Sequence, residues 1–202
     1  KQGDCHYILA GYPWFKCRAR DLFVSLPGLT LAIDEPEEFE DVMETAQKTL
    51  RCYMNNIPVD CKIYELDDPD VLLWAVWALQ QYAKETTREK CRIKYGDLLL
   101  EIIDFIRKGK HNNLFLHENG LLYTHGANKP VTWMNSTIDG HPVIPRTGYV
   151  VEVNALWYNA LRFVADMLKE DENPSLADTL DVLAQKTAVS FVETFRNEYG
   201  YL

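Results

Sequence analysis

The feature of this sequence that most constrains its fold is the recurrence of apolar residues at helical spacing in six separate blocks. No stretch sustains the strict alternation of apolar and polar residues that marks a half-buried strand. The chain has 202 residues, of which 47% are hydrophobic, so it can bury a substantial core. The pattern predicts an all-α protein that forms a single unit over residues 1–202, with six helices paired into three antiparallel hairpins.

Capping residues and turn signals set the expected bounds of these helices. Asp34 and Asp68 are predicted to cap the second and third helices, each with a proline close behind, and Ser175 is predicted to cap the sixth. Pro27 and Gly28 are expected to kink or interrupt the first helix. The expected helices span residues 21–33, about 35–54, 68–85, 88–108, 151–170 and 175–197.

The connection between the fourth and fifth helices, residues 111–148, is longer than a linker requires. It contains "HENGLLYTH", where Asn119-Gly120 is a tight-turn signal, so a short hairpin is expected there. Its rings and polar groups form the mix that sugar sites use, because rings stack on apolar sugar faces while amides and carboxylates bind hydroxyls. The alternative is a rigid surface loop without a ligand. The residues concerned are Trp133, Asn135, Asp139, His141, Arg146 and Tyr149.

Three acids, Asp21, Asp70 and Glu152, lie at the starts of the first, third and fifth expected helices. For each acid alone, interaction with the helix dipole is a sufficient explanation. In an up-and-down arrangement these starts share one end of the bundle, which would then collect acids, aromatic rings and the long connection. An ionised Asp21 in that position could accept two ligand hydroxyls at once, although Arg20 and Asp21 can also be a surface charge and a cap.

Composition argues against several classes of partner. A net charge of −9 without a long basic run disfavours nucleic acid and anionic membranes, and no stretch reaches the roughly 18 apolar residues of a membrane span. The cysteines lack CxxC spacing and no two histidines stand four residues apart, so we expect reduced thiols, no metal and no cofactor. Reduced thiols without a signal peptide indicate the cytoplasm. The cysteines are Cys5, Cys17, Cys52, Cys61 and Cys91.

Three segments of the chain resemble the C-terminal glucosidase domain of glycogen debranching enzymes, the amylo-α-1,6-glucosidase family. They read "AGYPWFKCRARDLFVSLPGLTLA", "DPDVLLWAVWAL" and "TWMNSTIDGHPVIPRTGYVVEVNALWYNALRF". The resemblance covers roughly residues 10–202 and is weaker over 34–66. It implies an (α/α)6 toroid of six inner and six outer helices, of which this chain would hold the first half. Because the sequence begins without Met and stops at "NEYGYL", we expect a fragment of a longer protein.

The resemblance implies inverting hydrolysis of an α-1,6-linked glucose on a limit dextrin, by an acid and a base about 6.5–9.5 Å apart. The family's Thr-Trp-Met-Asp motif supplies the acid, but its fourth residue here is Asn135, whose amide cannot transfer a proton usefully at neutral pH. Three explanations are open: a subfamily whose acid lies elsewhere, with Glu152 the nearest carboxylate; an inactive binding paralogue; or an engineered knock-out. The family's base is expected outside this chain.

The resemblance also assigns residues to the substrate. Arg20 and Asp21 correspond to the Arg-Asp pair that holds glucose hydroxyls in the innermost subsite. The family's Trp-Gly before that pair is replaced by Arg18-Ala19, which puts the outer-subsite preference in doubt. The other matched positions, expected to contact the ligand or frame the site, are Asp70, Trp74, Trp133, Arg146, Glu152 and Asn154.

Two classes of function therefore remain open, beside the third possibility of a helical scaffold without a sugar site. The first is a debranching glucosidase acting on an α-glucan or limit dextrin, and the second is a non-catalytic α-glucan-binding relative that lost its acid at Asn135. Polar residues at a barrel mouth argue against the scaffold. A half-barrel would expose an apolar face, so we expect the isolated fragment to form a homodimer.

Overall fold

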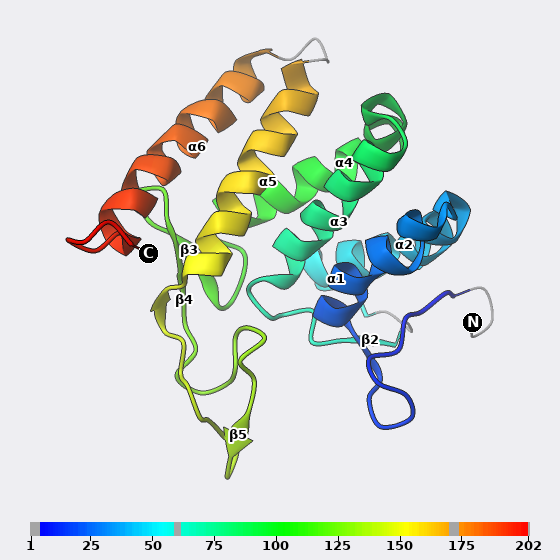
Figure 1. Cartoon of the computed structure of the whole chain (residues 1–202), viewed down its shortest axis with the longest axis horizontal. Coiled ribbons are helices and arrows are strands. Elements are labelled where there is room, and N and C mark those ends of the chain that lie inside the picture. Colours follow the sequence, from blue (N-terminus) through cyan, green and yellow to red (C-terminus); the bar gives the residue numbers. More distant parts are fainter. Residues whose placement is uncertain (1–4, 59–61, 170–173, 202) are drawn as a thin grey trace. The chain divides into compact units, whose positions relative to one another are not determined.

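The computed structural model describes residues 5–58, 62–169 and 174–201 (Figure 1). Contacts between residues divide the chain into two compact units, Lys1–Ile102 and Ile103–Leu202, and each is described by itself. The division falls within the fourth helix. The expectation of a single domain over the whole chain stays a prediction.

The described part of the chain contains six α-helices, as the spacing of apolar residues predicts. Each begins within about three residues of its expected start, and the sixth ends two residues early, as helix ends are the least regular part of a helix. Their bounds are α1 Ala19–Leu29, α2 Pro36–Met54, α3 Val71–Glu85, α4 Arg88–Arg107, α5 Val151–Lys169 and α6 Pro174–Phe195.

The first helix is interrupted close to the predicted place. Helix α1 continues through Pro27 and ends at Leu29, and a short 3-10 turn over Leu31–Ile33 follows. Because a proline ring removes one helical hydrogen bond and crowds the preceding turn, an end within two residues of it is expected. The fold therefore replaces one long helix with a helix and a turn.

The predicted caps at Asp34, Asp68 and Ser175 are wrong. Asp34 lies two residues before α2 in the left-handed conformation, at φ 63°, and α6 begins one residue before Ser175. The Asp68 carboxylate accepts a hydrogen bond from Arg20, while α3 begins only at residue 71. A cap candidate is lost when a tertiary partner binds its side chain or when the helix starts elsewhere.

The first unit is built around α3. Helix α1 packs against α3, and Phe39 of α2 stacks on Tyr82 of α3 with ring centroids 4.9 Å apart. Tyr95 of α4 meets the same Tyr82 ring edge-on at 5.6 Å, and the Tyr82 hydroxyl donates to Glu40 of α2. Tyr82 is fully buried, so one aromatic side chain connects three helices of this unit.

A short parallel strand pair aligns the starts of two helices in the first unit. β1 (Cys17–Arg18) pairs with β2 (Ile63–Tyr64), with Cys17 opposite Ile63 and Arg18 opposite Tyr64. β1 leads directly into α1, and β2 precedes α3 by a short segment. The pair therefore brings the segment before α3 against the first turn of α1.

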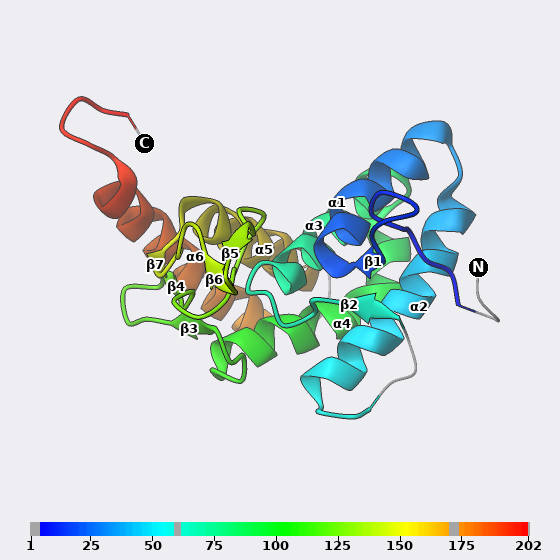
Figure 2. The same cartoon turned by 90° about the horizontal axis from the view of Figure 1, so that it is seen from below.

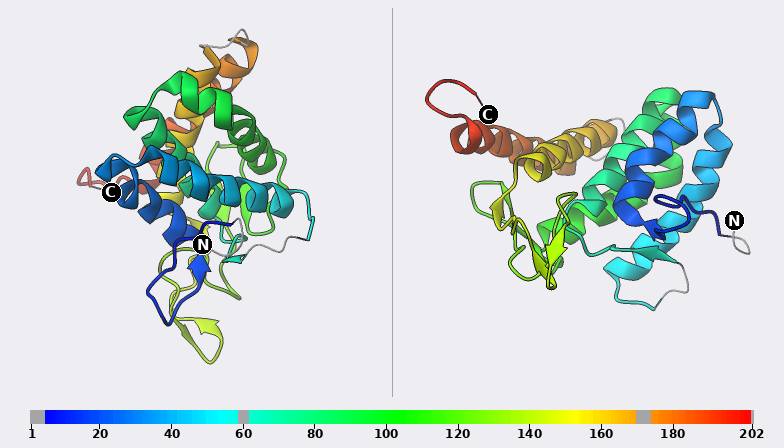
Figure 3. Two further views of the ribbon diagram at one scale, coloured as in Figure 1. Left: turned by 90° about the vertical axis from the view of Figure 1, so that its right-hand side faces the viewer. Right: turned by 60° about the horizontal axis from the view of Figure 1, so that its bottom comes forward.

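The second unit joins a helical hairpin to a small sheet. Helices α5 and α6 pack side by side and run in opposite directions, as predicted for successive helices (Figures 1 and 3). β3 (Leu114–Leu116), β4 (Leu122–Thr124) and β7 (Gly148–Tyr149) form an antiparallel sheet in the order β3-β4-β7 (Figure 2). β5 (Thr137–Ile138) and β6 (His141–Pro142) form a separate hairpin.

These strands qualify the all-α prediction. The hairpin expected around Asn119-Gly120 is confirmed as β3 and β4, with Gly120 at φ 85°. The remaining strands were missed, because two paired residues are too few to show alternation. The β5–β6 turn is Asp139-Gly140, both at positive φ, the Asp-Gly signal of a two-residue hairpin.

The described cysteines Cys5, Cys17, Cys52 and Cys91 are free thiols, as expected, and Cys61 lies outside the described residues. Burial raises the pKa of the Cys17 thiol to about 11 and that of Cys91 to about 12. Both are therefore protonated at neutral pH and poorly reactive. Among the described helices, none has the length and apolar character needed to cross a membrane.

Candidate functional site

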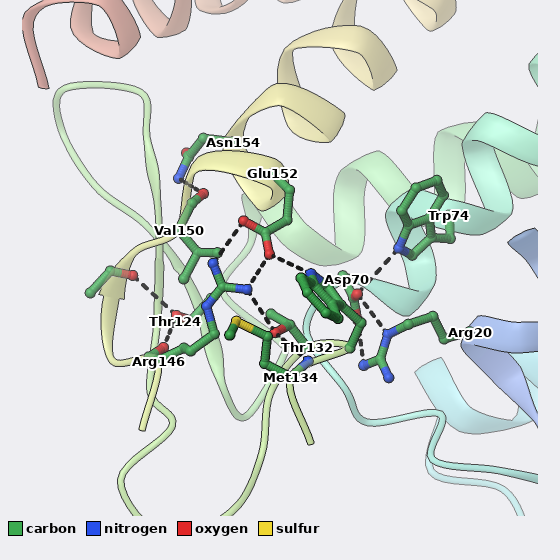
Figure 4. Close-up of polar contacts among 12 residues, drawn as sticks. Arg20, Asp70, Trp74, Thr124, Thr132, Met134, Arg146, Val150, Glu152 and Asn154 are labelled. Atoms are coloured by element: carbon green, nitrogen blue, oxygen red, sulfur yellow. Dashed lines mark hydrogen bonds and ion pairs between the residues drawn. The ribbon is translucent and has the colours of Figure 1, made fainter. Parts of the chain in front are cut away.

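The first polar cluster of interest lies in the first unit and consists of Arg20, Asp68, Asp70 and Trp74. Figure 4 shows three of them, Arg20, Asp70 and Trp74. Arg20 Nε and Nη2 donate to the two oxygens of Asp70 at 2.8 and 2.9 Å. Nη2 also donates to Asp68 Oδ2 at 2.7 Å. The strand pair before α1 explains this meeting, because it sets the first turn of α1 against the segment that carries both acids.

The charges of this cluster are almost completely removed from water. Arg20 is 7% exposed and Asp70 is 1% exposed. Burial by itself lowers the pKa of the Arg20 guanidinium, but the hydrogen bonds and charges of Asp70 and Asp68 raise it above its ordinary value. A paired, buried and permanently charged arginine of this kind joins α1 to α3.

Arg20 and Asp21, the two residues of α1 expected to bind the ligand, differ in how many of their hydrogen-bonding atoms are already occupied. The Nε and Nη2 hydrogens of Arg20 are all used by the acids, so only Nη1 is left for a sugar hydroxyl. Asp21, in the first turn of α1, is half-buried, and no side chain in the described ranges is bonded to its carboxylate. Asp21 can therefore accept hydrogen bonds from ligand hydroxyls, whereas Arg20 can only donate through Nη1.

Trp74 extends the first cluster along α3. Its indole Nε1 donates to Asp70 Oδ2 at 3.2 Å, one helical turn back. Its ring is half-buried and lies edge-on to Trp77, with centroids 5.5 Å apart and planes at 85°. Asp70 and Trp74, both expected to contact the ligand or frame the site, are thus joined by a direct hydrogen bond that fixes the indole plane.

The second cluster lies in the second unit and consists of Thr132, Trp133, Arg146 and Glu152. Figure 4 labels Thr132, Arg146 and Glu152. Arg146 Nη1 donates to Glu152 Oε1, and Nη2 donates to Oε2 at 2.9 Å. Nη1 also donates to Thr132 Oγ1 at 3.0 Å, and Trp133 Nε1 donates to Glu152 Oε1 at 3.2 Å. The first turn of α5 is in this way tied to two neighbouring residues of the long connection.

Backbone contacts hold Arg146 in place. The Thr124 hydroxyl lies 2.7 Å from the Arg146 carbonyl and 3.1 Å from that of Gly148, so it can donate to either. Gly126 packs so closely that a Cβ there would lie 2.9 Å from Val131 and 3.2 Å from the Arg146 carbonyl. Only glycine fits this approach, which explains a residue that the sequence did not single out.

Glu152 is an acceptor in this arrangement. Burial raises the pKa of its carboxyl, but the hydrogen bonds from Arg146 and Trp133 outweigh burial and lower the pKa below its ordinary value. The carboxylate is therefore ionised at neutral pH and already holds two donors. This geometry favours a fixed anion over a proton donor at Glu152.

Asn135 lies at a pocket beside this cluster. The pocket has a volume of about 240 Å³ and is lined by Trp133, Met134, Asn135, Ser136, Val143 and Ile144. Asn135 is exposed, and the Trp133 ring is 63% exposed although its Nε1 is fixed by Glu152. The pocket thus presents an oriented indole face and an amide to solvent.

The other expected residues have structural roles in the second unit. Asn154 is fully buried; its Oδ1 accepts from the Leu122 amide at 2.7 Å, and its Nδ2 donates to the carbonyls of Leu122 and Val150, both at 3.0 Å. It therefore frames the site by joining β4 to α5. Asp139 and His141 belong to the exposed β5–β6 hairpin.

One group in the described part of the chain has metal-compatible side chains, namely His6, Glu38 and Asp41, whose ligand atoms lie within 4.8 Å of one another. His6 Nδ1 lies 3.1 Å from Asp41 Oδ2, a contact that a hydrogen bond between the two side chains explains. The sequence did not single out these residues, since they do not share one helix.

A family model described as amylo-alpha-1,6-glucosidase matches residues 1–202, the whole chain. No curated protein matches the sequence.

Proposed function

Because the chain belongs to the amylo-alpha-1,6-glucosidase family, we propose that it forms part of a glycoside hydrolase that releases α-1,6-linked glucose from a limit dextrin with inversion. The observation that carries the proposal is the pocket at Asn135, whose exposed Trp133 ring is oriented by Glu152. In this proposal the six helices are the first half of an (α/α)6 toroid, and the general base is supplied from outside residues 1–202.

The described side chains have distinct tasks in this reaction. The Trp133 ring stacks on an apolar face of the glucose, and its plane is set before binding because Glu152 accepts its N–H. Arg146 binds Thr132 directly and binds Glu152, which in turn accepts from Trp133, so the two residues Thr132 and Trp133 that precede Asn135 are held in place. Asp21 of the first unit is assigned to the substrate by the family resemblance alone, and its carboxylate, to which no described side chain is bonded, is able to accept hydroxyls of a glucan.

Hydrolysis requires a proton donor for the leaving oxygen of the glycosidic bond. Asn135 occupies the family's acid position, and an amide has no proton to give at neutral pH. The hydrogen bonds of Glu152 lower its pKa, so it does not replace the missing acid readily. This observation favours the second candidate, an α-glucan-binding relative that retains the pocket and lacks hydrolysis.

Glucose release from a glucosyl-branched maltooligosaccharide by the full-length protein decides between the two candidates. Wild type is compared with Asp21→Asn, with Asn135→Asp, and with Asn128→Asp as a control that adds the same charge at an exposed position of the same connection. Release by wild type that Asp21→Asn abolishes supports the hydrolase. Binding without release in wild type, with release only in Asn135→Asp, supports the binding relative. No binding and no release in any variant would refute both.

A further inference from the structure

Two asparagines of this chain are followed by a glycine or a serine, in the pairs Asn119-Gly120 and Asn135-Ser136. An asparagine in such a pair loses its side-chain amide readily, because a small following residue leaves its backbone nitrogen open to react. That nitrogen attacks the asparagine Cγ and closes a succinimide ring, which expels ammonia. Water then opens the ring and leaves a carboxyl group. The surroundings of each pair decide whether the ring can close.

Asn119 is held in a way that opposes this reaction. Its Nδ2 donates to the Tyr149 hydroxyl at 3.2 Å, and its Oδ1 accepts from the Leu121 amide at 3.0 Å. The Gly120 N–H, which would have to attack, donates to the His117 carbonyl at 2.9 Å, and Gly120 is buried. Both reacting groups of this pair are therefore occupied, and hydrogen bonds must open before the ring can close.

Asn135 and Ser136 lack such restraints. Both residues are exposed and lie in neither a helix nor a strand, since β5 begins at Thr137. In the part of the chain that the structure describes, no hydrogen bond engages the Asn135 side chain, and none is donated by the Ser136 N–H. The Ser136 carbonyl accepts from the Val143 amide at 3.0 Å, so only the far side of this residue is bonded. The Asn135 Cγ and the Ser136 nitrogen can therefore meet by rotation about the bonds of Asn135.

We propose that Asn135 is a site of spontaneous deamidation, at which the amide nitrogen leaves as ammonia and a water oxygen completes a carboxyl group. Water is the only co-reactant. The ring opens at either carbonyl, so the products are aspartate and isoaspartate. The aspartate product places a carboxyl group at the pocket that carries the Trp133 ring, and it restores the Thr-Trp-Met-Asp motif of the family resemblance. This gain of an acid rests on the proposed function, whereas the modification itself rests on Asn135 and Ser136.

Peptide mass spectrometry of the full-length protein, kept in a warm and mildly alkaline buffer, measures conversion at each asparagine. In the folded protein, Asn135 is expected to convert roughly tenfold faster than Asn119, whose hydrogen bonds must open first. In urea those bonds are lost, and Asn119 is expected to convert first because glycine hinders the attack least. Ser136→Val places a branched side chain beside the attacking nitrogen and is expected to slow conversion of Asn135 roughly tenfold. Faster conversion of Asn119 than of Asn135 in the folded protein overturns the proposal.

Glucose release from a glucosyl-branched maltooligosaccharide separates this inference from the proposed function. Release by wild type is expected to rise during storage in proportion to the aspartate fraction at Asn135, which a protease that cleaves before aspartate and not before isoaspartate measures. Asn135→Asp is expected to be active from the start, and Asn135→Gln, which would have to close a larger ring, is expected to stay inactive. Conversion of Asn135 with no release by Asn135→Asp supports the modification site and refutes the hydrolase. Release by Asn135→Asp beside a folded wild type that never converts supports the hydrolase and overturns the modification site.

Discussion

Arg146 donates hydrogen bonds through both of its terminal nitrogens to the two carboxylate oxygens of Glu152. A lysine cannot reproduce this paired geometry, because its ammonium is a single point of donation. Arg146→Lys is therefore expected to release the segment that leads to Trp133 and to lower glucan affinity by roughly tenfold. Isothermal calorimetry with a branched maltooligosaccharide measures the loss.

The matched control for this change is Arg162→Lys, which alters an arginine of α5 that pairs with Asp181 of α6 away from the described clusters. We expect that variant to bind glucan as wild type does. Equal affinity for both variants would mean that the pairing of Arg146 and Glu152 does not orient the pocket.

The buried pairing of Arg20 with Asp68 and Asp70 is expected to dominate the stability of the first unit. Arg20→Leu leaves two buried carboxylates without their cation, and such a loss costs about 3–5 kcal/mol of the free energy of unfolding. Arg18→Leu is the control, since Arg18 pairs with Glu65 at the surface and is expected to cost at most about 1 kcal/mol. Urea unfolding of both variants gives the comparison, and similar losses would contradict it.

Glu40 predicts a specific dependence of stability on pH. Burial raises its pKa, but hydrogen bonds from Lys90, Lys94 and Tyr82 lower it from 4.5 to about 2 in the folded protein. The stabilisation from Glu40 is therefore present in full above pH 4.5 and is lost as the pH falls toward about 2. Glu40→Gln is expected to be less stable than wild type at pH 7 and to approach it near pH 2, as measured by urea unfolding.

A control for the Glu40 experiment lies one turn along the same helix. Glu44→Gln removes an exposed carboxylate that pairs only with Lys48 in the contacts described, so it is expected to change stability little at any pH. A difference between wild type and Glu40→Gln that persists down to pH 2 would show that packing, and not charge, accounts for the effect.

Gly126 is expected to tolerate no side chain. Gly126→Ala places a Cβ 2.9 Å from Val131 and 3.2 Å from the Arg146 carbonyl, a strain of about 1–3 kcal/mol. Gly96→Ala in α4 meets only the Arg92 side chain at 3.7 Å and is expected to stabilise the protein by up to about 1 kcal/mol. Thermal unfolding measures the shift of Tm in each variant, and the two shifts are expected to be opposite in sign. Two shifts in the same direction would refute the close approach.

The helices were predictable from the sequence because their signal is local. Apolar residues such as Phe39, Val42 and Met43 repeat at the helical period, and all three are buried. The caps failed for the opposite reason: Asp68 has the local features of a cap, but its carboxylate binds Arg20, which lies 48 residues away along the chain. A local sequence pattern around Asp68 carries no information about a partner that is so distant along the chain.

Most residues of the candidate site could be predicted from the sequence. The hydrogen bonds and ring contacts between them were harder to predict. Arg146, Glu152 and Trp133 were assigned through the family resemblance, and the structure brings these three together. Thr132 was missed, since a threonine beside an aromatic residue carries no distinctive pattern. The row of Phe115, Tyr123 and Tyr149 across the sheet was missed because Phe115 and Tyr149 are brought together only through Tyr123, which pairs with both.

The parallel pair of β1 and β2 has a consequence for how this chain can vary. By joining the residue before α1 to the segment before α3, it closes the whole of α2 into a loop whose ends are held together. Because the entropy of closing a loop rises only slowly with its length, insertions or deletions at the end of α2 leave Arg20 beside Asp70 at little cost. Length changes between residues 55 and 58 are therefore tolerated far better than any shift of register between Cys17 and Ile63.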